Sequence, residues 1–184
     1  PRLNKKVLEY AVKTSQALKC NINEEIFFSR KTYFYPDLAK NFQITQYEVP
    51  VGENGSFEVK VGDQQKEIGI TRLHIEEDPA KTQHKGGEAG DSDYTLVDYN
   101  RSGTPLLEIV TDPDFTSPKE ARAYLQQLAQ MLEYLEIYYP ESSFSLKSDA
   151  NISIDGGQRV EVKNITGTAG IQKALSYEIT RQKQ

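Results

Sequence analysis

Apolar residues alternate with polar ones on both sides of the turn-forming run Asp155-Gly156-Gly157, and this alternation constrains the fold more than any other feature. Successive side chains of a strand point to opposite faces, so the two apolar sets share one buried face only if Ile152 pairs with Val160. The pattern predicts a β-hairpin over residues 144–163 with a three-residue loop at 155–157. The alternating apolar residues are Ala150, Ile152, Ile154, Val160 and Val162.

The same register predicts a group of polar side chains on the opposite face of the hairpin. Asn151 then lies across from Glu161, and Asp149 lies across from Lys163, with Cβ atoms about 5 Å apart. Carboxylate and amide oxygens suit Mg²⁺, and a lysine beside them suits a phosphate oxygen. A solvated cross-strand salt bridge explains the same spacing and contributes little energy. The spacing alone favours the salt bridge.

A second acidic cluster follows His74, where the predicted strand over 66–75 runs into Glu76-Glu77-Asp78. Three consecutive carboxylates repel one another unless they are solvated or bridged by a cation. In a regular strand Glu76 and Glu77 face opposite ways, so only one of them joins a given site unless a bulge intervenes. The spacing supports a metal site and a solvated strand end equally.

The rest of the sequence predicts an α+β fold with a mixed or antiparallel sheet and flanking helices. Apolar residues recur at helical spacing over 4–19, with Asn4 as a cap. Ser117, the proline after it and Glu120 form a capping box that begins a second helix. The other predicted elements are a sheet over 33–61 broken at Pro36, Pro50 and a turn at 52–55, a strand over 106–111, and a last helix containing Ile171 and Ile179.

Residues 76–93 contain three glycines and almost no apolar side chain. Such a segment cannot bury enough surface to offset its ordering entropy, so we expect a mobile loop. Arg101 lies in a polar turn over 97–103. It could clamp a phosphate or carboxylate with both arms of its guanidinium group, or anchor its own loop, and the sequence supports the two roles equally.

Composition excludes several classes of protein. No apolar run approaches the roughly 18 residues that span a bilayer, so no membrane partner is expected. The formal net charge of −5 argues against a surface that binds nucleic acid mainly by neutralising phosphates. The single cysteine, Cys20, excludes an internal disulfide framework, fits a cytoplasmic location, and is expected to serve packing because no histidine is close in sequence.

Seven blocks of sequence resemble, in order, the characteristic blocks of the GatB subunit of the glutamine-dependent Asp/Glu-tRNA amidotransferase, and the likeness covers nearly the whole chain. They lie at 33–38, 44–47, 68–78, 97–110, 149–154, 160–164 and 177–182.

The resemblance implies a cradle fold related to that of glutamine synthetase and the guanidino kinases, with residues 1–184 forming part of the cradle domain. It implies that ATP phosphorylates the side-chain carboxylate of misacylated Glu-tRNA(Gln) or Asp-tRNA(Asn), and that ammonia from glutamine then displaces the phosphate. Its implied cofactors are ATP and Mg²⁺. Its implied partners are the amidase subunit and the small third subunit of the amidotransferase, together with tRNA.

Residue roles follow from the matching blocks. Glu76, Glu77, Asp149 and Glu161 are expected to bind metal. Glu76, Glu77, Asn151 and Lys163 are expected to bind the nucleotide. The expected catalytic residues are Glu77, Asp149, Glu161, Arg101 and Lys163.

The family also has a first strand with a Glu-x-His pair, a zinc-binding cysteine cluster, and C-terminal helical and tail domains. These are expected outside the present sequence, and an organellar targeting segment could precede it. Lys147 and residues 164–170 depart from the family pattern. The alternatives are the related archaeal GatE subunit, a noncatalytic tRNA-binding module, and a metal-dependent phosphodiesterase.

Overall fold

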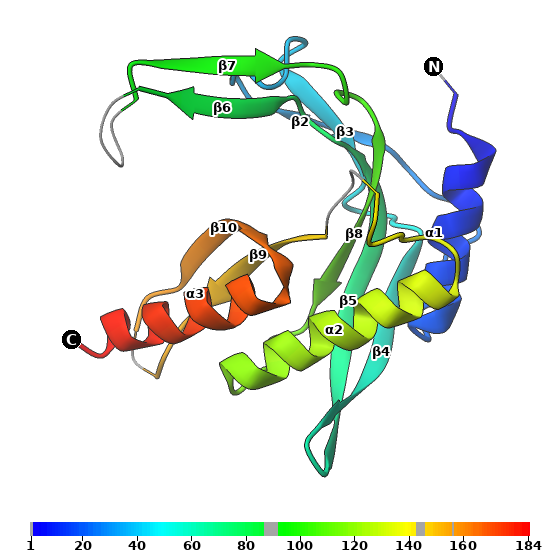
Figure 1. Ribbon diagram of the computed structural model, residues 1–184. Coiled ribbons are helices and arrows are strands. Elements are labelled where there is room, and N and C mark those ends of the chain that lie inside the picture. Colours follow the sequence, from blue (N-terminus) through cyan, green and yellow to red (C-terminus); the bar gives the residue numbers. More distant parts are fainter. Residues whose placement is uncertain (1, 87–91, 143–145, 156) are drawn as a thin grey trace. The chain divides into compact units, whose positions relative to one another are not determined.

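The computed structural model describes residues 2–86, 92–142, 146–155 and 157–184 (Figure 1). Within these residues, helices and antiparallel strand pairs confirm the predicted α+β class. The helices are α1 (Lys5–Ala17), α2 (Pro118–Tyr134) and α3 (Gly167–Gln182). The strands are β1 (Asn21–Ile22), β2 (Ser29–Thr32), β3 (Phe42–Thr45), β4 (Gly52–Val61), β5 (Gln64–Glu77), β6 (Lys81–Lys85), β7 (Tyr94–Asp98), β8 (Pro105–Thr111), β9 (Lys147–Ile152) and β10 (Val160–Thr166).

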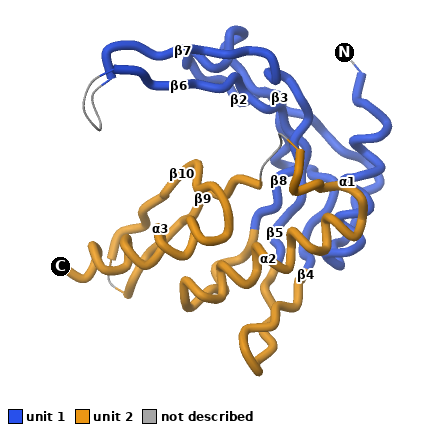
Figure 2. The backbone as a smooth tube through the Cα atoms, viewed as in Figure 1, with its two compact units in different colours: residues 1–55, 70–110 blue, residues 56–69, 111–184 orange. Residues whose placement is uncertain are grey.

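The described strands form one sheet of order β1-β4-β5-β8 and three two-stranded sheets, β2–β3, β6–β7 and β9–β10. The chain divides into two compact units, which Figure 2 colours separately. Unit 1 comprises residues 1–55 and 70–110, and unit 2 comprises residues 56–69 and 111–184. Strands β4 and β5 contribute residues to both units. No helix in the described part of the chain is long and apolar enough to cross a membrane.

In unit 1, helix α1 begins as predicted, because the Asn4 side chain accepts a hydrogen bond from the backbone N–H of Lys6. The turn predicted at 52–55 is wrong, since these residues open β4. The two glycines serve close packing rather than chain reversal. A Cβ atom on Gly52 would lie 2.6 Å from the Ser15 hydroxyl, and one on Gly55 would collide with the end of α1. Sequence cannot separate these two uses of glycine.

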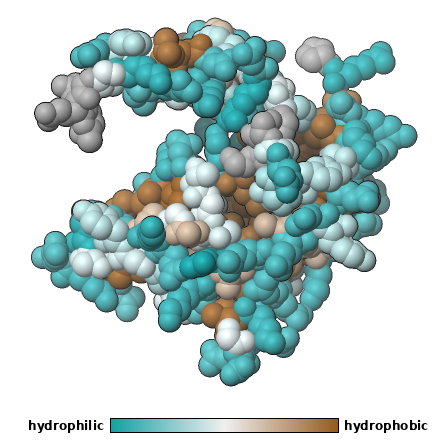
Figure 3. Space-filling view, viewed as in Figure 1, coloured by the Kyte–Doolittle hydropathy of each residue, from teal (hydrophilic) through white to brown (hydrophobic). Residues whose placement is uncertain are grey.

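The loop predicted over 76–93 is also partly wrong. Glu76 and Glu77 end β5, and Lys81–Lys85 forms β6, which pairs with β7 through Lys81↔Asp98 and Lys85↔Tyr94. Backbone hydrogen bonds between the strands replace the apolar anchors that the segment lacks. Residues 87–91 lie outside the described part. Most side chains of this hairpin remain exposed, and Figure 3 shows a small hydrophobic patch over β7, where Leu96 is 51% exposed.

In unit 2, Ser117 caps α2 as predicted, and its hydroxyl accepts a hydrogen bond from the Glu120 N–H. The Glu120 carboxylate reaches back to the N–H of Thr116, one residue earlier than in the standard capping box. The core of this unit contains Tyr124. Its ring meets those of Phe57 and Phe115 edge to face, at 5.8 and 5.3 Å between centroids.

The hairpin β9–β10 confirms the predicted register at Ile152↔Val160 and Asn151↔Glu161. The register shifts between Val162 and Ile165, so the predicted pairing of Asp149 with Lys163 is replaced by a β-bulge. Asn164 adopts a φ of 57° in this bulge, and its N–H donates to the Asp149 carboxylate at 2.8 Å. The predicted three-residue loop is too short, because the strands end at Ile152 and resume at Val160. Residues 144, 145 and 156 of the predicted hairpin lie outside the described part.

The α2 cap generates a prediction about acid stability. Burial alone would raise the pKa of Glu120, but hydrogen bonds from Lys66 and Thr116 outweigh it and lower the pKa to about 2. A carboxylate with a depressed folded-state pKa stabilises the protein above its unfolded pKa and loses this effect as pH falls toward the folded value. The free energy of unfolding should therefore fall between about pH 4.5 and pH 2.

Glu120→Gln should lower the free energy of unfolding by about 1 to 2 kcal/mol at pH 7 and flatten its fall below pH 4.5. Urea unfolding between pH 2 and pH 7 measures both effects. Glu133→Gln, at an exposed position of the same helix, is the matched control. Equal pH profiles for the two variants would contradict the assignment.

Candidate functional site

In unit 1, His74, Glu76 and Glu108 meet on neighbouring strands β5 and β8. His74 Nε2 lies 3.2 Å from Glu108 Oε2 and 3.7 Å from Glu76 Oε2. His74 and Glu76 share a face because they are two residues apart on one strand. The imidazole is buried, whereas Glu108 has 48% of its side chain exposed. The site thus has a buried base and an open carboxylate edge.

The electrostatics of this group tie the imidazole to its two carboxylates. Burial alone would lower the pKa of His74, but the hydrogen bonds and charges of Glu108 and Glu76 outweigh it and raise the pKa. The hydrogen bond from His74 is the main cause that lowers the pKa of Glu108. Burial and the charges of Asp37 and Glu76 raise the pKa of Tyr33 to about 12. The carboxylates of Glu76 and Glu108 therefore favour a positive charge at His74.

The donor set fits a divalent cation. One imidazole nitrogen and two carboxylate oxygens lie within 4.8 Å of one another. Among the described residues, this is the one group of three or more histidine, cysteine, aspartate or glutamate side chains that could hold a metal ion. Carboxylate oxygens suit Mg²⁺ and Mn²⁺, and the imidazole nitrogen favours the transition metal. The second ring nitrogen of His74, Nδ1, is buried and has no hydrogen-bond partner among the described residues.

Glu108 was not predicted as a candidate ligand. The signal was present, since Glu108 is the one charged residue in the apolar strand Pro105–Thr111. An acid in the middle of an apolar strand costs solvation energy unless it has a partner. The partner is the imidazole of His74, 34 residues earlier in the chain, and only the pairing of strands reveals it.

Each of the three consecutive acids lies near its own basic side chain. Glu76 approaches His74, Glu77 forms an ion pair with Lys40, and Asp78 pairs with Arg101 at 3.0 Å. Mutual repulsion is thereby relieved without a bound metal. Glu76 and Glu77 reach different partners, which agrees with the predicted alternation.

Glu77 and Arg101 therefore already have structural contacts. The Glu77 carboxylate also accepts a hydrogen bond from the N–H of Ile44 at 3.1 Å. Arg101 joins its loop to Asp78, which is 5% exposed. This contact supports the loop-anchoring role of Arg101, and the phosphate role stays a prediction.

In unit 2, the structure brings together the predicted polar residues of the hairpin. Lys163 Nζ lies 3.4 Å from Glu161 Oε2 and 3.9 Å from Asp149 Oδ2. All three side chains are exposed, and Asn151 pairs with Glu161 in the strand register. One ammonium group thus bridges two carboxylates on a solvated face. The arrangement is the predicted cross-strand ion pair, and it also offers oxygen ligands and a cation to a nucleotide.

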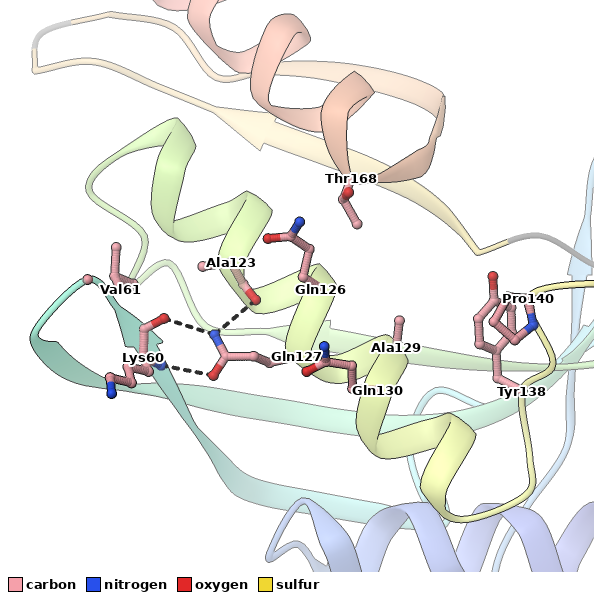
Figure 4. Close-up of a pocket in the computed structure, with 11 residues that line it drawn as sticks. Lys60, Val61, Ala123, Gln126, Gln127, Ala129, Gln130, Tyr138, Pro140 and Thr168 are labelled. Atoms are coloured by element: carbon pink, nitrogen blue, oxygen red, sulfur yellow. Dashed lines mark hydrogen bonds between the residues drawn. The ribbon is translucent and has the colours of Figure 1, made fainter.

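A pocket of about 640 Å³ in unit 2 lies apart from these residues (Figure 4). Its lining contains no carboxylate and no histidine, and none of the predicted site residues. Figure 4 shows the Gln127 amide turned to the backbone of Lys60, with which it forms two hydrogen bonds. The pocket lining therefore offers no carboxylate or imidazole ligand for a metal.

Fold and site define an α+β protein with clustered carboxylates suited to a divalent cation. The family model for the GatB/GatE catalytic domain matches residues 1–184. The chain belongs to this family.

Three relatives are named as the B-type subunit of aspartyl/glutamyl-tRNA(Asn/Gln) amidotransferase. The protein of Methanospirillum hungatei JF-1 is 52% identical over 183 residues, that of Methanoregula boonei 53% over 184 residues, and that of Haloquadratum walsbyi 50% over 199 residues. The matches cover all of this chain but only 38%, 38% and 40% of the relatives.

The His74–Glu76–Glu108 group generates a metal-binding prediction. Glu108→Gln should weaken Mn²⁺ binding by about tenfold or more, because it removes the open carboxylate ligand. Calorimetric titration of the purified protein with Mn²⁺ measures the affinity, and Glu25→Gln, an exposed acid in unit 1, is the control. If Glu108→Gln and Glu25→Gln bound Mn²⁺ equally well, the group would be an ion-pair cluster only.

Proposed function

We propose that this chain is the catalytic part of an enzyme that amidates Glu or Asp attached to tRNA. The observation that carries the proposal is the family match over residues 1–184, joined to about 50% identity with proteins named as B-type subunits of an amidotransferase. The named relatives are aspartyl/glutamyl-tRNA(Asn/Gln) amidotransferases, so the proposed substrates are Asp-tRNA(Asn) and Glu-tRNA(Gln).

The proposed chemistry explains why acidic clusters recur in the chain. A side-chain carboxylate is a poor electrophile until one of its oxygens becomes part of a phosphate leaving group. Phosphoryl transfer from ATP activates it, and ammonia then attacks the acyl carbon and displaces phosphate. Such a transfer depends mainly on positioning and on neutralising charge on the phosphate oxygens. A bound Mg²⁺ supplies this neutralisation.

We assign the metal-binding role in unit 1 to Glu76 with His74 and Glu108, with Glu77 beside them. The contacts among the first three support this choice. To bind a metal, the Glu77 carboxylate must leave its ion pair with Lys40. Alternatively, Glu77 acts indirectly, by holding β3 through its hydrogen bond from the Ile44 N–H. Arg101 is proposed to contact a phosphate or carboxylate from its anchored loop.

In unit 2, we assign metal binding to Asp149 and Glu161, and nucleotide phosphate binding to Asn151 and Lys163. Their shared exposed face supports the assignment. Lys163 keeps the two carboxylates paired in the absence of ligand, and it can turn its ammonium group to a phosphate oxygen because its side chain is 62% exposed.

The proposal extends to the rest of the protein. The relatives are longer than this chain and are named as subunits. We propose a cradle-type domain that works in the cytoplasm with an amidase subunit, a small third subunit and tRNA. The zinc site of the family is proposed to lie in a segment before residue 1.

The test uses the complete heteromeric enzyme with ATP, Mg²⁺, misacylated tRNA and supplied ammonia. Glu77→Ala, Asp149→Ala and Glu161→Ala should each lower ATP-dependent amidation by about 100-fold or more, because each removes a group that stabilises transition-state charge. Phosphate release from labelled ATP and amide formation on tRNA are measured together.

Two controls keep this test specific. Glu25→Ala, at an exposed acid of unit 1, should retain wild-type amidation. Thermal unfolding separates loss of chemistry from loss of fold, which matters for Glu77 because its carboxylate also binds the Ile44 N–H. Near-normal amidation by all three stable variants would leave these acids with structural roles only, as members of ion pairs.

A further inference from the structure

The side chain of Gln182, in the last turn of α3, is hydrogen-bonded to the backbone where β9 ends. Its Oε1 accepts from the N–H of Ile154 at 3.2 Å, and its Nε2 donates to the carbonyl of Ile152 at 3.2 Å. Ile152 is the last residue of β9 and pairs with Val160. One amide group therefore satisfies a backbone acceptor and a backbone donor at the point where strand pairing stops.

Glu178 and Arg181 fix the orientation of this amide. The Glu178 carboxylate is 5% exposed and accepts from Gln182 Nε2 at 2.8 Å. Arg181 donates to the two oxygens of the same carboxylate at 2.8 and 2.7 Å. These hydrogen bonds, first those of Arg181 and then that of Gln182, lower the pKa of Glu178 to about 2. An ionised carboxylate only accepts, so the NH₂ group must face Glu178 and the carbonyl oxygen must face Ile154.

The same hairpin carries the polar face assigned above to metal and nucleotide. Asn151 and Glu161 lie one residue inside the end that Gln182 holds. Near the other end of the face, the bulge N–H of Asn164 holds the Asp149 carboxylate. The polar face is thus held at one end by the Asn164–Asp149 hydrogen bond within the hairpin, and at the other end by Gln182 of α3.

We propose that Gln182 is a positioning residue. It holds the end of β9 in one geometry so that Asn151 and Glu161 present their oxygens together to a divalent cation and a nucleotide phosphate. This inference rests on the proposed function of the hairpin. Gln182 itself contacts no reacting group and acts through the backbone of Ile152 and Ile154.

Gln172 provides a matched control on the same helix. It is the same residue type, and its amide oxygen accepts from Arg122 of α2 at 3.0 Å. Gln182→Met and Gln172→Met each keep the length of the side chain and remove its amide. Only the first variant removes hydrogen bonds to the hairpin.

The experiment compares these variants in the full protein with its partner subunits. Hydrogen exchange of the Ile154 amide should be at least about tenfold faster in Gln182→Met than in Gln172→Met, because its acceptor is gone. The Mg²⁺ concentration for half-maximal ATP-dependent amidation should rise about tenfold in Gln182→Met, with a smaller change in kcat at saturating Mg²⁺. A purely structural glutamine would lower thermal stability without moving this Mg²⁺ dependence.

Faster exchange of Ile154 with an unchanged Mg²⁺ midpoint would overturn the positioning role. If Gln182→Met does not fold, Gln182→Glu is measured in its place. This variant keeps an oxygen that accepts from the Ile154 N–H and loses the NH₂ group that donates to the Ile152 carbonyl. A wild-type Mg²⁺ midpoint in a folded Gln182→Glu enzyme would also overturn the proposal.

Full amidation by Asp149→Ala and Glu161→Ala would refute the proposed use of the hairpin. If Asp149→Ala and Glu161→Ala were inactive but Gln182→Met and Gln172→Met had the same Mg²⁺ midpoint, only the positioning role would be refuted.

Discussion

Glutamine side chains form hydrogen bonds with the main chain of strands in both units, and those of Gln43, Gln46 and Gln182 reach strands that carry candidate ligands. In unit 1, Gln43 donates to the carbonyl of Glu77 and Gln46 accepts from the N–H of Ile75. In unit 2, Gln127 pairs with both backbone groups of Lys60, and Gln182 bonds in the same way at the end of β9. An amide has both a donor and an acceptor, so it replaces a neighbouring strand where none is present. Buried backbone groups left without such partners would cost about 1 to 3 kcal/mol each.

Local ion pairs decide what the acidic clusters can do. Glu77, Asp78 and Asp149 each lie near a lysine or arginine, so acidity by itself does not require a metal. The group formed by His74, Glu76 and Glu108 differs, because its base is a buried imidazole and one carboxylate is half exposed. A divalent cation competes there with a proton on His74, and the charge of Arg72 also acts on Glu108. Metal binding at this group should therefore be coupled to proton release.

Particular residues show how far local rules carry a prediction. The caps at Asn4 and Ser117 were predictable because capping depends on a few adjacent residues. The register of Ile152 with Val160 was predictable because alternation and a shared core face leave one solution. The bulge at Asn164 was not predicted. It shifts the phase of the apolar residues between Val162 and Ile165, but Ile165 is the one apolar residue of β10 after the shift, which is too few to establish a new phase. The strand β6 was missed for another reason: its hydrogen bonds come from β7, across residues that carry no apolar signal.

The sequence by itself determined the α+β class, the two strongest helices, the hairpin register and the family, because these depend on periodicity, on short capping patterns and on ordered blocks of residues. It also placed Asp149, Glu161 and Lys163 on one face. Only the tertiary structure joined His74 to Glu108, gave Glu77 and Arg101 their ion-pair partners, and brought Gln182 to the end of β9. Those contacts join residues that lie from 23 to 37 positions apart in the chain. Spacing along the chain says nothing about such pairs, because the fold alone decides which distant segments become neighbours.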